Sequence, residues 1–141
     1  MKNEELNYVF GISKNKELDS LAIDKIVRKG FPVSVINKTK KRFAVSDAEL
    51  AKMAGVNIKS FRRNLIAGRR MSLVASDRIF RLIDILCLAM QVFASHKSAI
   101  WWMREPNFNL RGRKPIDLIE TEAGGNKVRD ILTAIIYGYP A

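Results

Sequence analysis

Side chains that could carry out catalysis or bind a metal are scarce in this sequence of 141 residues. His96 is the sole histidine and Cys87 the sole cysteine, and no Cys or carboxylate cluster accompanies His96 along the sequence. Cys87 lies in an apolar run, where a thiol behaves as a small apolar side chain. We find no glycine-rich phosphate loop and no nucleophile at a recognisable spacing from a base. We therefore expect no enzyme, no metal site and no cofactor.

Basic and polar side chains, which suit the binding of phosphates and base edges, gather instead between residues 57 and 70. The stretch AELAKMAGVNIKSFRRNLIAG, residues 48–68, has the spacing of two helices that meet at a tight turn. Ala51 is small where the helices would cross, Gly55 would supply the turn, and Val56 would help to fill the wedge. The second helix then displays polar side chains toward a major groove. The candidate DNA-binding residues are Asn57, Lys59, Ser60, Arg62, Arg63, Arg69 and Arg70.

These candidates divide into two expected roles, because the N-terminal part of a recognition helix usually contacts bases. The expected base readers are Lys59, Ser60 and Arg63. The expected phosphate contacts are Arg62, Arg69 and Arg70. One such helix reads only a few base pairs, so we expect a homodimer, with its interface on residues 18–36 or 76–93. The same pattern also fits a short helix pair in any α-bundle, with its charges facing solvent.

The charge balance favours a polyanionic partner, meaning a nucleic acid or an anionic membrane surface. The formal net charge is +11, from 25 Lys and Arg against 14 Asp and Glu. The basic excess is +5 over residues 1–45 (10 against 5), +4 over residues 46–95 (8 against 4) and +2 over residues 96–141 (7 against 5). A nucleic acid would therefore face the N-terminal two thirds of the chain.

Helices are the elements expected to position these side chains. Apolar residues recur at helical spacing from residue 18 to the C-terminal end, and no segment alternates with period two for long enough to form a sheet. A capping-box pattern at Ser46 and Glu49 predicts a helix start. The expected inward positions include Leu21, Ile66, Ile135 and Ile136. We predict an all-α fold, a helical bundle, preceded by a flexible arm over residues 1–17.

Targeting signals and membrane spans are not expected. The first twenty residues contain no apolar core of a signal peptide. The most apolar run, residues 79–93, is too short to cross a bilayer and contains Arg81 and Asp84. A single cysteine also excludes an intrachain disulfide, which fits a reducing compartment. We expect a cytoplasmic protein with no membrane partner.

Several motifs with fixed spacing follow the helix-turn-helix pattern. One is GRRMSLVASDRIFRL, residues 68–82, with a Gly-Arg-rich turn, a Ser-Asp-Arg and a long helix. The last forty-one residues, WWMREPNFNLRGRKPIDLIETEAGGNKVRDILTAIIYGYPA, carry more of them. These are a Trp and an Arg before Pro106-Asn107, Gly112-Arg113-x-Pro115, Asp117-Leu118, Thr121-Glu122-Ala123-Gly124 and Tyr137-Gly138. From about residue 25 onward the chain resembles antitoxins of the Xre/ParS type, which partner RES-domain toxins. Glu105, Lys114 and Gly125 depart from the family pattern, and residues 1–17 match nothing in it.

The resemblance implies a division of labour between two domains. Residues 18–95 would form a dimerising Xre-like, Cro/C1-like helix-turn-helix DNA-binding domain, and residues 96–141 a C-terminal helical toxin-binding domain. The implied toxin-binding residues are Trp102, Arg104, Arg111, Gly112, Arg113, Pro115, Asp117, Glu122, Tyr137 and Tyr139. The two arginines of the Gly-Arg motif can bond carboxylates in two places at once, and the two tyrosines can act as aromatic anchors.

The implied function is that of a type II antitoxin. It would block the NAD site of a RES-domain toxin, which consumes NAD or transfers ADP-ribose from it, and would repress its own operon by binding operator DNA. Two alternatives stay open. One is a stand-alone Cro/C1-like transcription regulator without a toxin partner. The other is a toxin-binding protein whose helix-turn-helix no longer binds DNA.

Overall fold

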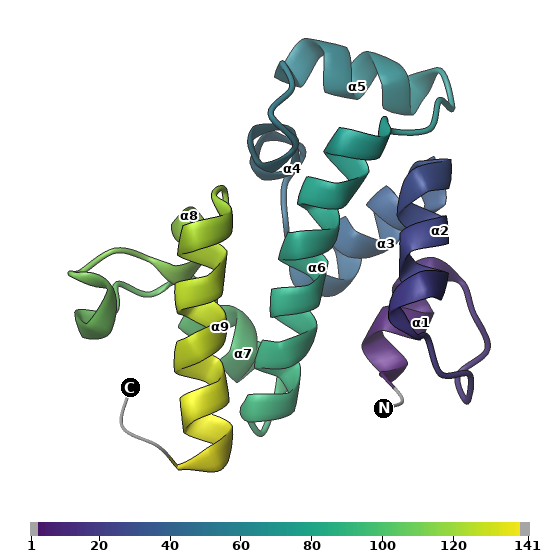
Figure 1. The fold of residues 1–141 in the computed structure, drawn as a ribbon. Coiled ribbons are helices and arrows are strands. Elements are labelled where there is room, and N and C mark those ends of the chain that lie inside the picture. The colour runs from purple at the N-terminus through teal and green to yellow at the C-terminus, as the bar shows by residue number, and fades with distance from the viewer. Residues whose placement is uncertain (1–2, 139–141) are drawn as a thin grey trace. The chain divides into compact units, whose positions relative to one another are not determined.

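The chain is all-helical in a computed structural model that describes residues 3–138, which confirms the predicted fold class (Figure 1). Its elements are α1 (Glu4–Phe10), α2 (Ser20–Lys29), α3 (Val33–Phe43), α4 (Asp47–Ala54), α5 (Ile58–Ile66), α6 (Leu73–Val92), α7 (His96–Arg104), the 3-10 helix η1 (Phe108–Leu110), α8 (Pro115–Leu118) and α9 (Glu122–Tyr137). Over the described residues there is no strand, and one isolated bridge joins Asn107 to Arg113. None of the helices in this part of the chain has the length and apolarity needed to cross a bilayer.

The chain forms two compact units, Met1–Phe80 and Arg81–Ala141, and the division falls inside α6. We refer to them as unit 1 and unit 2. The domain junction expected after residue 95 lies later than this division. The reason is that α6 is one continuous helix with buried residues in both units, so no loop or change of composition marks the boundary.

Helix α1 contradicts the expectation of a flexible arm over residues 1–17. Asn3 caps this helix by accepting a hydrogen bond from the Leu6 amide at 3.0 Å, and the side chains of Leu6 and Val9 are buried. Asn7 is buried as well, and its amide group donates to the carbonyl groups of three loop residues, Ser13, Lys14 and Lys16. The prediction is therefore wrong for residues 4–10, and the following loop is tied to the helix.

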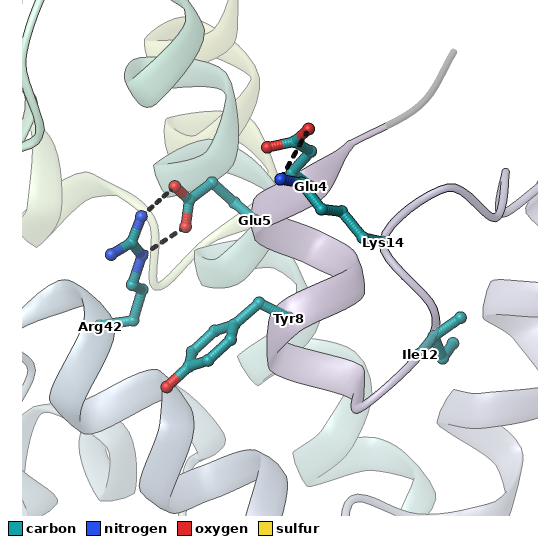
Figure 2. A pocket seen from close by; sticks show the side chains of 6 residues that line it. All are labelled: Glu4, Glu5, Tyr8, Ile12, Lys14 and Arg42. Atoms are coloured by element: carbon teal, nitrogen blue, oxygen red, sulfur yellow. Dashed lines mark hydrogen bonds and ion pairs between the residues drawn. The ribbon is translucent and has the colours of Figure 1, made fainter.

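Helix α1 is held against α3 by polar side chains around a shallow pocket (Figure 2). Arg42 of α3 donates from Nε to Glu5 Oε2 at 2.6 Å and from Nη2 to the other oxygen of the same carboxylate. Its guanidinium carbon also lies 5.9 Å from the ring centroid of Tyr8. Glu4 and Lys14 form a second, exposed ion pair at 3.9 Å. The charged side chains that line this pocket pair with one another, and the pair between Arg42 and Glu5 joins α1 to α3.

The core of unit 1 holds the helix-turn-helix in place. Ser46 and Glu49 form the predicted capping box at the start of α4, and Gly55, with φ 73°, ends that helix in the left-handed conformation. Both predictions are confirmed. The largest fully buried side chains of this unit are Phe31, Ile36, Phe43, Leu50, Phe61 and Ile79.

In unit 2 the second half of α6 lies against the C-terminal helices. Arg81 donates from Nη1 to the carbonyl oxygens of Ile119 and Glu120, each at 3.0 Å, and so holds the turn before α9. Arg129 of α9 pairs with Asp84 of α6 at 2.7 Å. These contacts explain why polar residues interrupt the apolar surface of α6: they join it to α9.

Some residues expected to face inward are exposed. Leu21 and Ile66 are 80% and 88% exposed, and Val56, Ile135 and Ile136 are exposed to a smaller degree. Helical periodicity gives the direction of an apolar stripe but not how much of it the neighbouring helices cover. Residues 76–93, one of the two expected dimer interfaces, include eight residues that are buried within the chain's own units and three that are exposed.

Candidate functional site

The first candidate site is the surface of α5, the second helix of the helix-turn-helix. The ring of Phe61 is fully buried and packs this helix into unit 1, while Lys59 and Arg63 are exposed. Asn57 caps the helix, accepting from the Lys59 amide at 2.8 Å. Arg63 donates from Nη2 to Ser60 Oγ at 3.1 Å. Of the three predicted base readers, Lys59 and Arg63 lie on the part of α5 that faces away from Phe61, and Ser60 is half-buried beside them.

Arg62, a predicted phosphate contact, is engaged within the chain. Its Nε lies 3.6 Å from Asp47 Oδ2, and the other oxygen of this carboxylate lies 2.7 Å from Lys40 Nζ. Asp47 stands in the first turn of α4, so it connects three helices of unit 1. The Arg62 side chain is still 60% exposed, so a phosphate could accept from its guanidinium. The sequence analysis missed this role of Asp47, since its partners are remote in the sequence.

Arg70 is also held by the scaffold. Its Nη1 donates to the carbonyl oxygen of Gly30 at 2.8 Å, which anchors the segment after α5 to the end of α2. A side chain at Gly30 would bring its Cβ within 2.2 Å of the Met71 carbonyl oxygen, so the two segments pass too closely for any residue but glycine. Arg69 is exposed. Of the expected phosphate contacts, Arg69 keeps a purely surface position, while Arg70 serves the fold.

The Ser-Asp-Arg motif is built into the structure of unit 1. Ser76 is fully buried and its hydroxyl accepts from the Phe31 amide at 2.8 Å. Arg78 donates to the carbonyl oxygen of Ala54 at 3.4 Å, and its Nη1 lies 2.2 Å from where a Cβ on Gly55 would stand. The motif thus fixes α6 in two places: to the turn between α2 and α3 through Phe31, and to the end of α4 through Ala54. Ser76 and Arg78 support the helix-turn-helix, whereas Asp77 is exposed.

The second candidate site is the surface of α7, α8 and α9 with the loop between α7 and α8. The exposed members of the predicted set are Arg111, Gly112, Arg113, Asp117, Glu122 and Tyr137. Trp102 and Arg104 are half-buried, and the Trp102 ring lies 5.5 Å from that of Phe93. Pro115 is buried at the first position of α8, so it shapes the loop and is not open to contact in the free chain. Tyr139 lies outside the described residues.

The predicted toxin-binding residues do not form one compact cluster. Glu122 and Tyr137 mark the first and last residues of α9, which its 16 residues separate by roughly 22 Å at 1.5 Å per residue. The loop that carries Arg111 and Arg113 precedes α8 and so belongs to the Glu122 end, because a Cβ on Gly124 would meet the Leu118 carbonyl oxygen at 2.0 Å. A partner that contacts the whole set must follow the length of α9.

Sequence reasoning missed an apolar pocket beside α7. It is lined by Phe93, Lys97, Ser98, Trp101 and Trp102 and has a volume of about 360 Å³. Trp101 is 62% exposed. Adjacent aromatic residues on one helix point in different directions, so only the structure shows which tryptophan is packed and which is open. Across residues 3–138 no three His, Cys, Asp or Glu side chains are grouped to hold a metal ion.

The fold and the two surfaces define a helix-turn-helix protein with a second helical unit. Residues 22–84 match the family model of the antitoxin Xre-like helix-turn-helix domain, and residues 88–138 match that of the antitoxin Xre/MbcA/ParS C-terminal toxin-binding domain. The junction between the two matches, residues 85–87, falls within α6.

Curated relatives agree with both family models. An antitoxin Xre of Yersinia enterocolitica is 30% identical over 113 residues, which cover 79% of this chain and 76% of that protein. Antitoxins Xre of Photorhabdus laumondii and Pseudomonas putida are 25% and 24% identical, over 82% and 78% of this chain and 79% and 68% of their own lengths. The chain belongs to the Xre antitoxin family. It is a type II antitoxin with a helix-turn-helix domain and a toxin-binding domain.

Proposed function

We propose that this antitoxin neutralises a RES-domain toxin by obstructing its NAD pocket, and that it represses its own operon as a homodimer on operator DNA. The observation that carries the toxin half is the match of residues 88–138 to a toxin-binding domain, together with the polar side chains exposed on the same residues. Such a function would operate in the cytoplasm, where NAD and the operon are found.

The exposed arginines give the toxin half a chemical rationale. In dinucleotide pockets a carboxylate often bonds a ribose hydroxyl, and a guanidinium binds a carboxylate through two parallel hydrogen bonds. Arg111 and Arg113 stand two residues apart in the loop before α8, and both are exposed. They can therefore bind carboxylates at the mouth of the toxin's pocket. This binding needs no catalytic group in the antitoxin, which fits the proposal that the antitoxin is not an enzyme.

The surface of α5 supports the DNA half. Lys59 and Arg63 are exposed on its outer side, and Arg63 and Ser60 are joined by a hydrogen bond that fixes the direction of the guanidinium. A dimer would place two such helices on a repeated half-site. Leu21, exposed on α2 within residues 18–36, supplies apolar surface for that dimer.

The alternative of a stand-alone transcription regulator accounts for residues 22–84 only. It offers no reason for a toxin-binding domain over residues 88–138. A toxin-binding protein with an inactive helix-turn-helix accounts for both matches, and it differs from the proposal only in operator binding.

The test is to express the product of the adjacent reading frame alone and together with the full chain, and to measure cellular NAD and colony survival. We expect NAD loss and death with the neighbour alone, and recovery of both with the antitoxin. Full-length chain is needed, because a chain ending at Ser95 would lose α9 and expose the buried surface of α6. If the product of the adjacent reading frame kills cells without lowering NAD, and the full chain still neutralises it, the chain remains an antitoxin but its partner is not a RES-domain toxin.

A further inference from the structure

The loop between α7 and α8 presents a large apolar side chain that nothing among residues 3–138 covers. Phe108 is 95% exposed, the highest value of any large apolar residue among residues 3–138. It opens the short helix η1, and Figure 1 shows this segment projecting from the rest of the unit formed by α7, α8 and α9. A phenylalanine in this position gains no burial in the free chain, so its ring is available for contact with another molecule.

The loop that carries Phe108 is closed by its own hydrogen bonds. We call residues 107–113 the Phe108 loop. The Asn107 amide donates to the Arg113 carbonyl oxygen at 3.0 Å, and the Gly112 amide donates to the Asn107 carbonyl oxygen at 2.9 Å. The Asn107 side chain accepts from the Asn109 amide at 2.9 Å. Asn107 therefore makes three of the hydrogen bonds that close the loop. Phe108 follows it directly, so the ring extends from a backbone that is already ordered.

The buried side of the same loop fixes its orientation. Leu110 is 5% exposed and packs into unit 2, two residues after the exposed Phe108. An ordered loop loses little conformational entropy when a partner docks, which is the requirement for an anchor that must hold tightly. A flexible connection between α7 and α8 would join the same helices but would not present the ring in one direction.

The backbone of the loop contains two successive residues in the left-handed conformation. Arg111 has φ 56° and the following Gly112 has φ 79°. Left-handed backbone is unfavourable for a residue with a side chain, and such residues gather at ligand-binding sites. At Gly112 a Cβ would meet nothing within 4 Å, so glycine is required there by the backbone conformation and not by space.

Charge indicates the character of the surface that receives the ring. Arg111, Arg113 and Lys114 are exposed, and residues 106–114 contain no acidic residue. Complementarity then requires a partner pocket with an apolar floor and an acidic rim. The loop lies within the residues that match the toxin-binding domain, which identifies the partner as the toxin. This step rests on the proposed function.

We propose that Phe108 is the apolar anchor of the toxin interface, inserted into an acid-rimmed pocket of the toxin by the ordered loop of residues 107–113. Central aromatic anchors in protein interfaces usually account for a large part of the affinity. The surrounding cations then set the orientation and the rate of docking, while the buried ring determines how slowly the complex dissociates.

The test measures the binding of full-length variants to the purified product of the adjacent reading frame by biolayer interferometry. Phe108→Ala should weaken binding by about 30-fold or more, the loss that defines an interface anchor. Phe108→Leu, which keeps an apolar side chain, should recover most of that loss. Ile66→Ala is the matched control, since it also removes a large exposed apolar side chain, 88% exposed, but from unit 1, and it should leave the affinity for the toxin within about twofold. Arg113→Glu should lower the association rate.

Two results would overturn the inference. Wild-type affinity in Phe108→Ala would show that the ring does not contact the toxin. A Phe108→Ala chain that binds the toxin normally but changes its oligomeric state in sedimentation velocity would assign the ring to a contact between two antitoxin chains. If the wild-type chain itself does not bind the product, the proposed function fails, and that result is distinct from the failure of one variant. Operator binding by Phe108→Ala, measured in parallel, should equal that of the wild type.

Discussion

Single residues in the helix-turn-helix differ in how strongly the fold constrains them. Arg62 and Arg70 are bonded to Asp47 and to the Gly30 carbonyl oxygen, whereas Arg63 bonds only a neighbour on its own helix, Ser60, among the contacts described above. A side chain held by the scaffold can touch a phosphate at a fixed place. A side chain whose partner lies on the same outer surface can exchange that partner for a base edge.

We predict that Arg63→Ala weakens operator binding by about 1–3 kcal/mol and weakens binding to random DNA less, because a guanidinium that reads a base contributes to discrimination. Fluorescence anisotropy with both DNA sequences, at one salt concentration, measures the difference. The control is Arg62→Ala, which should reduce the affinity for both DNA sequences alike, as a phosphate contact does. Equal losses on both sequences for Arg63→Ala would show that it contacts a phosphate instead.

At the scale of elements, local signals were predicted well and long-range ones were not. The capping box at Ser46 and the turn at Gly55 depend on residues within four positions of one another, so the sequence alone predicted them correctly. Helix α1 was missed because three apolar residues in a polar stretch gave no clear period, and its contacts with α3 are remote in the sequence. The tether of Arg62 depends on Asp47, on a different helix, and no pattern in the sequence links the two.

The start of α9 shows what a long-range contact requires of one residue. A Cβ at Gly124 would stand 2.0 Å from the Leu118 carbonyl oxygen and 2.9 Å from its carbon, so the backbone of α8 and α9 would have to separate. The Thr-Glu-Ala-Gly motif, which the resemblance assigned to the toxin-binding region, thus has a structural task at this glycine. Thr121 caps α9 in the same motif, accepting from the Gly124 amide at 3.0 Å.

We predict that Gly124→Ala lowers the free energy of unfolding by about 1–3 kcal/mol, the usual cost of forcing extra atoms into a packed site. Gly125→Ala is the matched control. Its Cβ would meet Arg81 Cδ at 3.0 Å and Ile85 Cδ1 at 3.4 Å, both in side chains that can move, and alanine favours the helix by up to about 1 kcal/mol over glycine. Urea unfolding followed by circular dichroism compares the two. Equal stability of both variants would mean that α8 and α9 do not approach as closely as described.

At the scale of the whole molecule, the positive charge is concentrated in unit 1. The basic excess is +9 over Met1–Phe80 (17 against 8) and +2 over Arg81–Ala141 (8 against 6). The proposed anchor of the second surface is instead an apolar ring, Phe108. DNA binding releases counterions, so its affinity falls steeply with salt, whereas a contact made by a buried ring depends little on salt. The salt dependence of the two affinities can therefore distinguish the two activities in one intact chain.

We predict that raising the salt concentration from 50 to 200 mM lowers operator affinity by on the order of a thousandfold or more, the loss expected if a dimer makes about six or more phosphate contacts. Toxin affinity should fall by less than about tenfold, since surface charges such as Arg113 are screened while the buried ring is not. Measuring both affinities on one preparation of the full-length chain avoids any truncation. A toxin affinity that falls as steeply as the operator affinity would show that the cations of the loop, and not Phe108, hold the toxin, because only charge-dominated contacts are lost in proportion to salt.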